Sequence, residues 1–361
     1  MKVLFQNRFD YLNTPGGDTT QLLKTKEYLE KIGVDVDVST NPNIDLSKYD
    51  LVHIFNIMRP FETYLFIKNA LKQNKKIVMS SIYWDFDEFN KLGRNSKLMG
   101  FLYNNFDEFF VEKIKYFKRK DIIFKHKNDF FSFFIKDYKK ILENVDLFLP
   151  NSGNEGKIVQ KKISDKINYQ VVFNAVDKEN FYLKNFSNRN KDSLIVSRID
   201  PRKNILNLVE AFKDVNYQLD IYGNATPLHL GYLENIKQNM TNNINLNDYV
   251  SHEKLIELYS QYKLHILPSW LETPGLSQLE AAACGCNILS TNRGSAEEYF
   301  GEMAFYCTPN SIESIKEGII KAMNNLNEPN IISEFILDNY TWDKTAIQTK
   351  NAYERVLNNN V

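Results

Sequence analysis

Short apolar runs alternate with amphipathic stretches along the whole chain, and this alternation restricts the fold more than any other feature of the sequence. In the first half, strands are predicted at residues 2–6, 34–38, 51–55, 77–81, 147–150 and 170–173. In the second half, strands are predicted at residues 194–198, 218–222, 264–268, 288–291 and 304–307. Several runs are apolar without strict alternation, which is typical of strands buried on both faces of a parallel sheet. We therefore expect an α/β protein with two doubly wound domains.

The length of 361 residues agrees with two domains of roughly 150 residues each. The first domain is expected at residues 1–178 and the second at residues 179–340. The boundary is placed in the polar, Asn-rich stretch at residues 177–192. Residues 341–361 are predicted to form one more helix, with Thr341 as its N-cap.

Charge and cysteine content exclude several classes of protein. Lysine plus arginine (45) equals aspartate plus glutamate (45), so there is no overall attraction for nucleic acid. No apolar run approaches the roughly 20 residues of a membrane span, and residues 7–10 are polar where a signal peptide needs its apolar core. The three cysteines suit neither a disulfide framework nor a zinc site: Cys284, Cys286 and Cys307. We expect a cytoplasmic protein without a bound metal.

One segment, residues 86–146, is too long for a simple connection and is expected to form a helical insertion in the first domain. Residues 112–140 contain ten Lys/Arg but only four Asp/Glu, and phenylalanines lie between these charged residues in the sequence. The segment is either a set of amphipathic helices that cover the sheet, or a basic aromatic surface. In the second case it would bind an acceptor or the inner face of an anionic membrane. The composition leaves these alternatives open.

The stretch PSWLETPGLSQLEAAACGCNILST at residues 268–291 carries the clearest chemical signal. A buried strand ends in a loop that contains Glu272 and a Pro-Gly pair, and a helix follows. Ser277 and Glu280 have the spacing of a capping box, with Ser277 as the N-cap. Free backbone N–H groups and a partial positive charge at such a helix start favour phosphate binding. Glu272 and Glu280 could instead be a glycosidase acid/base pair, because their spacing alone does not fix their distance.

The same stretch resembles the E-x7-E motif of retaining glycosyltransferases of the GT-B fold, family 4, also called glycosyl transferases group 1. Further segments resemble that family in the same order along the chain: residues 14–17, 174–177, 197–204, 221–223 and the helix that contains Trp342. The resemblance implies two Rossmann-like domains with a cleft between them and a C-terminal helix that returns to the first domain. The first domain would bind the acceptor and the second the nucleotide sugar.

The resemblance also implies roles for charged residues of the second domain. Arg198 and Lys203 would hold the donor diphosphate and stabilise the negative charge that grows on the leaving group. Glu272 would lie beside the donor sugar. Glu280 would accept hydrogen bonds from the ribose hydroxyls.

Backbone groups complete the expected donor site. Gly275, Leu276 and Ser277 would offer N–H groups to the phosphates, and Gly223 matches the family's glycine at the end of a strand. Gly16 and Gly17 would let the backbone of the first domain approach the diphosphate, because a side chain there would block it. A plain strand–helix turn, capped by Asp18 and Gln21, is the alternative for this pair.

The implied reaction transfers a sugar from a nucleotide diphosphate sugar to a hydroxyl with retained anomeric configuration, by front-side displacement. It needs no enzymic nucleophile, no cofactor and no metal. A UDP sugar is the favoured donor. The acceptor is expected to be a glycan or a lipid-linked saccharide of surface polysaccharide biosynthesis.

One departure from the family concerns the acceptor side. Many relatives carry a histidine near the end of the first domain's fourth strand, where this chain reads IVMSSIYWDFDE. Trp84 and Asp85 are candidate acceptor residues, but a core aromatic followed by a capping aspartate explains them equally well. A non-catalytic nucleotide-sugar or glycan-binding scaffold is therefore the main rival. A dinucleotide-dependent oxidoreductase is disfavoured, since residues 7–20 lack G-x-G-x-x-G.

Overall fold

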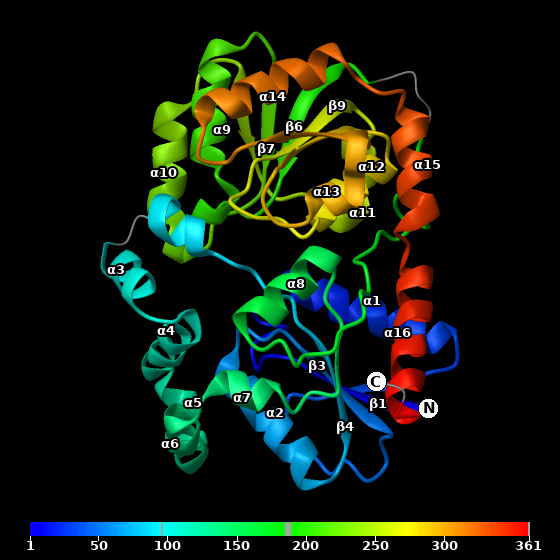
Figure 1. Ribbon diagram of the computed structural model, residues 1–361. Helices are drawn as coiled ribbons and strands as arrows, with labels where there is room; N and C mark the ends of the chain where they lie inside the picture. The colour runs from blue at the N-terminus through cyan, green and yellow to red at the C-terminus, as the bar shows by residue number, and fades with distance from the viewer. Residues whose placement is uncertain (95–96, 185–188, 360–361) are drawn as a thin grey trace. The chain divides into compact units, whose positions relative to one another are not determined.

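The computed structural model describes residues 1–94, 97–184 and 189–359. The chain divides into two compact units. The first contains residues 1–84, 101–174 and the C-terminal segment from Trp342, and the second contains residues 85–100 and 175–341. Each unit is built on one parallel sheet with helices around it (Figure 1). The prediction of two doubly wound α/β domains is confirmed.

The first unit has a five-stranded sheet in the order β2-β1-β3-β4-β5, with every neighbouring pair parallel. Its strands are β1 (Lys2–Gln6), β2 (Asp35–Val38), β3 (Leu51–Phe55), β4 (Lys76–Ser80) and β5 (Leu147–Phe148). The main helices around it are α1 (Gly17–Lys31), α2 (Pro60–Lys72), α8 (Gly153–Lys162) and α16 (Trp342–Leu357). Residues 170–173 are not a strand, and the chain there makes only an isolated bridge at Tyr169 to Phe148.

The C-terminal helix α16 belongs to the first unit and packs along α1. The Tyr353 hydroxyl of α16 lies 2.6 Å from Nδ1 of His53 in β3, and Ser80 Oγ of β4 lies 3.0 Å from the other ring nitrogen. All three side chains are buried. These three polar side chains thus form a buried hydrogen-bond network that joins the last helix to β3 and β4.

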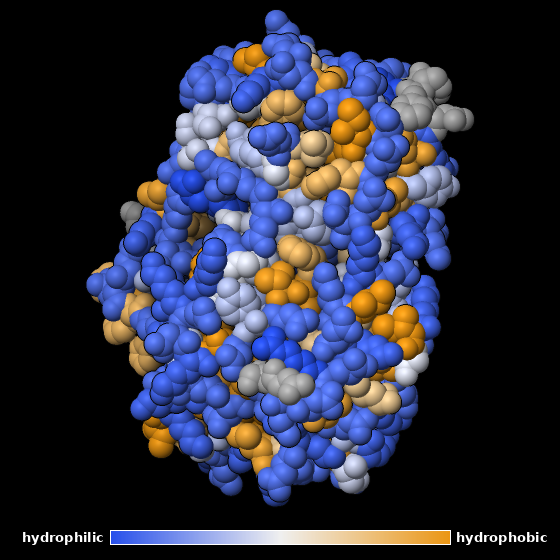
Figure 2. Space-filling view, turned by 45° about the vertical axis from the view of Figure 1, so that its right-hand side comes forward, coloured by the Kyte–Doolittle hydropathy of each residue, from blue (hydrophilic) through white to orange (hydrophobic). Residues whose placement is uncertain are grey.

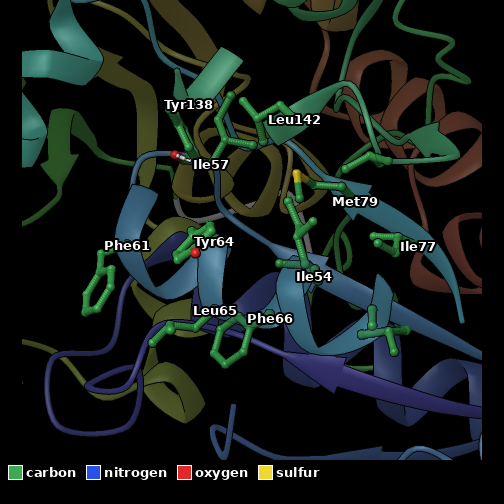
Figure 3. Packing of buried hydrophobic residues seen from close by; sticks show 14 of the residues in the cluster. Ile54, Ile57, Phe61, Tyr64, Leu65, Phe66, Ile77, Met79, Tyr138 and Leu142 are labelled. Atoms are coloured by element: carbon green, nitrogen blue, oxygen red, sulfur yellow. Dashed lines mark hydrogen bonds between the residues drawn. The ribbon is translucent and has the colours of Figure 1, made fainter. Parts of the chain in front are cut away.

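The described residues of the inserted segment include the short α-helices α3 (Lys97–Asn105), α4 (Glu108–Lys115), α5 (Lys120–Lys125), α6 (Lys127–Ile135) and α7 (Tyr138–Leu142). Inner side chains of α4, α5, α6 and α7 join the core of the first unit. In Figure 3, Tyr138 and Leu142 lie near Ile57 and Met79, and the Tyr138 hydroxyl donates to the Ile57 carbonyl at 2.9 Å. The helices therefore cover the sheet, as the first of the alternatives predicted, while their outer faces remain exposed.

The second unit has a six-stranded parallel sheet in the order β11-β10-β9-β6-β7-β8. Its strands are β6 (Lys191–Val196), β7 (Leu219–Tyr222), β8 (Ile244–Asn247), β9 (Tyr262–Leu267), β10 (Asn287–Thr291) and β11 (Ala304–Cys307). The sequence did not predict β8, a half-polar strand at the sheet edge. Every residue of β10 is buried, so helices cover both faces of the sheet there.

The helices of the second unit fall into two groups (Figure 1). In one, α9 (Ile205–Ala211) packs on α10 (Leu230–Asn239) and α14 (Ile312–Asn324). In the other, α12 (Leu276–Ala283) packs on α11 (His252–Tyr259) and α15 (Pro329–Asn339). The short helix α13 (Ala296–Phe300) follows β10.

The division between the units differs in two places from the expected one. It falls after Asn174, whereas the sequence placed it after residue 178, and residues 185–188 of the expected boundary stretch lie outside the described residues. Residues 85–100, expected within the first domain, group with the second unit. The reason is tertiary: Phe89 packs on Trp270, and the Arg293 guanidinium donates to Glu88 at 2.7 Å.

Candidate active site

The loop between β9 and α12 places Glu272 in a buried position beside a cation. The Glu272 side chain is 1% exposed, and its carboxylate accepts a hydrogen bond from Lys203 Nζ at 2.5 Å. Burying a carboxylate is costly unless a charged partner compensates it. Lys203 is that partner, so the two predicted residues form one ion pair.

The backbone of Glu272 is held by the loop that follows β10. The Glu272 N–H donates to the Arg293 carbonyl at 3.2 Å, and the Ser295 N–H donates to the Glu272 carbonyl at 2.8 Å. Gly294 lies between them with φ +92°, and a Cβ there would come within 2.1 Å of the Glu272 oxygen. Only glycine permits this approach. The sequence analysis missed this clamp, although the Arg-Gly-Ser turn after a predicted strand was a signal for it.

Lys203 is fixed by its neighbours at the start of α9. Asp200 caps the short turn Pro201–Lys203 by accepting from the Arg202 N–H at 2.9 Å. Asn204 follows with φ +59°, and its side-chain amide donates to the carbonyls of Pro268 and Pro309. Because Pro268 lies just after β9, Asn204 ties the lysine to the strand that leads to Glu272. Asn204 is a further functional candidate that the sequence analysis overlooked.

Arg198 is a further cation near the Asp200 carboxylate. Its guanidinium is half exposed and 4.0 Å from the Asp200 carboxylate. Burial alone would raise the pKa of Asp200, but Arg202, Lys203 and Arg198 together hold that pKa below its ordinary value. The site thus concentrates positive charge around one buried carboxylate.

Gly223 lets the end of β7 approach the segment that carries Arg198. A Cβ on Gly223 would stand 1.8 Å from the Ser197 carbonyl oxygen. The two segments are joined by hydrogen bonds from Ser197 N–H to the Tyr222 carbonyl and from Ile199 N–H to the Asn224 carbonyl. Gly223 therefore has a structural reason to be glycine, whatever else it contacts.

The expected capping box at Ser277 is wrong. Helix α12 begins at Leu276, with Gly275 as its N-cap at φ +84° and no side-chain cap. A Cβ on Gly275 would lie 2.9 Å from a Leu267 methyl and 3.1 Å from Glu272 Oε2. The N–H groups of Leu276 and Ser277 lie in the first turn, where an α-helix provides no acceptor for them.

Glu280 instead turns toward α11. Its carboxylate lies 3.3 Å from Nε2 of His252 and 3.4 Å from the hydroxyl of Tyr259, which is completely buried. Burial and the neighbouring carboxylate raise the pKa of Tyr259, so the hydroxyl stays a proton donor. Glu280 is thus held by two side chains and is not used to cap its own helix.

These residues meet at one edge of the second sheet. Arg198, Lys203, Gly223, Glu272 and the start of α12 all follow the carboxyl ends of parallel strands. In doubly wound sheets, that edge is where ligands bind. The arrangement offers fixed cations, a buried carboxylate and a helix N-terminus for a phosphorylated ligand.

The predicted glycine pair lies in the first unit, at the start of α1. Gly16 is the N-cap, and a Cβ there would meet Asp18 Oδ1 at 3.0 Å, whereas a Cβ on Gly17 would meet nothing within 4 Å. The alternative in which Asp18 and Gln21 cap the helix is wrong. Asp18 accepts from the buried Arg8 guanidinium at 2.7 Å, and Gln21 donates to Asn151 at 2.8 Å.

Arg8, which the sequence analysis missed as a functional candidate, organises the loop that leads to this pair. Its guanidinium donates to Asp18, to the Asp10 carboxylate at 2.9 Å and to the Thr14 carbonyl at 2.7 Å. Burial alone would lower its pKa, but Asp18 and Asp10 hold that pKa above its ordinary value. The loop is therefore preformed by one cation.

The two candidate acceptor residues fall into different units, Trp84 in the first and Asp85 in the second. Both are partly exposed. Asp85 Oδ1 accepts a hydrogen bond from the Asp87 N–H at 3.1 Å. Tyr83 before them is buried, and its N–H donates to the buried Glu155 carboxylate at 2.8 Å.

The remaining titratable candidates are core residues. Burial lowers the pKa of both His53 and His265 to about 3, so both rings are neutral at pH 7. Within residues 1–94, 97–184 and 189–359, no group of three His, Cys, Asp or Glu side chains has the arrangement of a metal site. In the same ranges, no helix is long and apolar enough to cross a membrane.

The family described as "Glycosyl transferases group 1" matches residues 177–336, which contain Arg198, Lys203, Gly223, Glu272 and Glu280. The match covers less than half of the chain and lies within the second unit. The O-antigen chain mannosyltransferase B of Escherichia coli is 25% identical over 177 residues, which are 45% of each chain. An uncharacterized glycosyltransferase of Methanocaldococcus jannaschii is 27% identical over 303 residues, covering 72% of this chain and 74% of the relative.

A human relative, one subunit of phosphatidylinositol N-acetylglucosaminyltransferase, is 27% identical over 223 residues, or 57% of this chain and 44% of its own. This match and the E. coli match therefore span less than half of the relatives' lengths.

Solved structures share the fold over nearly the whole chain. A sucrose-phosphate synthase of Thermosynechococcus elongatus superposes with a TM-score of 0.74 at 16% identity, covering 99% of this chain and 100% of that one. Anabaena HepE in complex with UDP superposes with a TM-score of 0.69 at 14% identity, covering 98% and 100%. The predicted GT-B fold is confirmed.

Proposed function

We propose that this group 1 glycosyltransferase domain makes the protein a retaining family 4 enzyme that transfers a sugar from a UDP sugar to a hydroxyl of a glycan or lipid-linked saccharide. The observation that carries the proposal is the ion pair of Lys203 with the buried Glu272, beside the start of α12, which no side chain caps. A group that leaves as a nucleoside diphosphate needs fixed positive charge, and this edge of the sheet supplies it.

Each donor residue has a defined part in this reaction. Arg198 and Lys203 bind the diphosphate and stabilise the charge that develops on it. The N–H groups of Leu276 and Ser277 bind its oxygens at the positive end of α12. Glu272 faces the sugar, and Glu280 accepts from the ribose hydroxyls while His252 and Tyr259 hold it in place.

In the proposed front-side displacement, the bond from the anomeric carbon to the phosphate oxygen breaks as the bond to the acceptor oxygen forms on the same face. The acceptor proton passes to the leaving phosphate. The chain then supplies positioning and charge, without a nucleophile or a metal. Gly16 and Gly17 would bring the backbone of the first unit to the same diphosphate.

The names of related proteins support the nature of the substrates. The relatives include an O-antigen mannosyltransferase and part of a phosphatidylinositol N-acetylglucosaminyltransferase, and structures of HepE were determined with UDP and UDP-glucose. They favour a UDP sugar as donor, a lipid-linked or polymeric acceptor and a role in surface polysaccharide biosynthesis.

A thermal-shift panel of UDP, GDP and TDP and their common sugars, with EDTA present, tests the donor site. A ligand at 100 times its Kd stabilises the folded state by about 2.7 kcal/mol, which is readily measured. We expect UDP to give the largest shift. No shift with any nucleotide would contradict the proposal and favour a glycan-binding scaffold.

A further inference from the structure

Five phenylalanines of the inserted helices form a continuous aromatic row, which we call the aromatic ridge: Phe106, Phe110, Phe117, Phe131 and Phe134. Ring centroids are 5.5 Å apart from Phe106 to Phe110, 6.4 Å from Phe110 to Phe134 and 5.4 Å from Phe134 to Phe117. The buried ring of Phe130 joins Phe117 to Phe131. The ridge thus crosses α4, the turn after it and α6.

The ridge is not needed to fill the core. On α4 and α6 the inward side chains Phe109, Phe130 and Phe133 are already buried. Four ridge members nevertheless remain exposed, from 39% for Phe110 to 58% for Phe131. Phe124 of α5 and Ile135 of α6 are more than 80% exposed.

Scattered apolar residues are normal on a protein surface, and Figure 2 shows such small groups on a largely hydrophilic face. A set of exposed rings linked through Phe134 and the buried Phe130 is different, because it marks a contact with another apolar phase.

Positive charge surrounds the ridge. Six exposed lysines of the segment make no ion pair with any described residue: Lys118, Lys120, Lys125, Lys127, Lys136 and Lys140. The acidic side chains are largely engaged, since Asp129 pairs with Lys68, Glu112 with Lys115, and Asp137 caps α7. Lys118 directly follows Phe117, and Lys127 lies one turn before Phe131. Unpaired cations and exposed rings therefore share the same helices.

We propose that the aromatic ridge and its lysines dock on the anionic surface of a lipid bilayer. Phenylalanine rings enter the boundary between headgroups and acyl chains, and lysines beside them attract anionic headgroups. Charge complementarity selects this occupant over an apolar protein surface, which would have to bury six unpaired ammonium groups. The proposal does not rest on the proposed transferase activity.

Co-flotation of the full chain with vesicles tests the docking. One set contains phosphatidylcholine alone, and the other contains phosphatidylcholine and phosphatidylglycerol in equal parts. We expect binding to the anionic vesicles only, falling as salt screens the lysines. No flotation with anionic vesicles, or equal flotation with both sets, would overturn the proposal.

Two variants locate the contact. A quadruple variant, Lys118→Gln, Lys120→Gln, Lys125→Gln and Lys127→Gln, should lower the partition coefficient by on the order of 600-fold, since each lysine near such a surface contributes about fivefold. The matched control removes four exposed lysines elsewhere: Lys157→Gln, Lys166→Gln, Lys254→Gln and Lys321→Gln. Equal losses in both variants would place the contact outside the ridge.

The aromatic variant Phe110→Ser, Phe117→Ser and Phe131→Ser should also bind anionic vesicles more weakly. If the wild type is instead a dimer that this variant converts to a monomer, with vesicle binding unchanged, the ridge is a contact between copies and the proposal fails. UDP-induced thermal shifts of all variants should equal that of the wild type. That readout shows that the variants fold and separates this test from the test of the donor site.

Discussion

The Lys203 ammonium group and the Glu272 carboxylate, 69 positions apart in the sequence, lie 2.5 Å from each other at the carboxyl edge of the second sheet. The glutamate is buried, and the lysine is about one-fifth exposed. The lysine therefore has two tasks, to compensate a buried charge and to offer positive charge to a diphosphate. These tasks can be separated by mutation.

The variant Lys203→Ala should lose both stability and nucleotide affinity. Removing one partner of a buried pair leaves the Glu272 carboxylate uncompensated, which typically costs about 3–5 kcal/mol. The double variant Lys203→Ala with Glu272→Gln should recover much of that stability but none of the UDP affinity. Urea unfolding and UDP titration of both variants measure the two effects.

The control for this pair is Lys237→Ala, because the exposed Lys237 pairs with the exposed Glu234 on the surface of α10. It should change both readouts much less. If the double variant binds UDP as the wild type does, Lys203 does not contact the diphosphate.

The variant Tyr259→Phe should weaken UDP binding without affecting pyrophosphate. It removes only the hydroxyl that donates to Glu280, so the glutamate loses one of the two groups that hold it. A hydrogen bond of this kind contributes about 1 kcal/mol, which corresponds to roughly a fivefold loss in affinity. Calorimetric titration with UDP and with pyrophosphate measures the difference.

Tyr232→Phe is the matched control, because it also removes a buried tyrosine hydroxyl. That hydroxyl accepts a hydrogen bond from the Leu206 N–H and, among the described residues, makes no hydrogen bond to Glu280. Equal losses for UDP and pyrophosphate in Tyr259→Phe would mean that Glu280 does not bind the ribose.

The features that sequence could predict are those carried by local patterns. Alternating strand and helix stretches predicted both sheets, and the spacing of Glu272 and Glu280 located the loop and helix after β9. Lys203 was named as a candidate because residues 197–204, which follow a predicted strand, resemble a segment of the family. Each of these signals lies within a short stretch of chain.

The misses have tertiary causes. Ser277 has the right spacing for a capping box, but the positive φ of Gly275 lets α12 start earlier, and Glu280 turns to a partner 28 residues away. Residues 85–100 join the second unit through Trp270 and Arg293, which no local pattern reveals. The aromatic ridge depends on contacts between rings of separate helices.

The variant Gly17→Ala should show whether residue 17 is glycine because it contacts the ligand or because the fold requires it. A Cβ at Gly17 would meet no atom within 4 Å, so the protein itself does not require glycine there. Stability should therefore stay within about 0.5 kcal/mol of the wild type. If the backbone at Gly17 approaches the diphosphate as proposed, sugar transfer should fall at least tenfold.

Gly231→Ala is the matched control, because Gly231 also lies in a first helical turn with open space around its Cα. It should leave both stability and transfer unchanged. Unchanged transfer in Gly17→Ala would remove Gly17 from the site.

Acid should destabilise the fold before most carboxylates titrate. Burial lowers the pKa of His53 and His265 from an ordinary value near 6.5 to about 3, so the unfolded chain binds protons that the folded chain does not. Their stabilising contribution is complete above pH 6.5 and falls as the pH drops toward 3. Urea unfolding from pH 7 to pH 5 should therefore show a falling free energy of unfolding, and the slope should weaken in His53→Gln and again when His265→Asn is added. A slope that both substitutions leave unchanged would show that these rings are not buried and neutral in the folded protein.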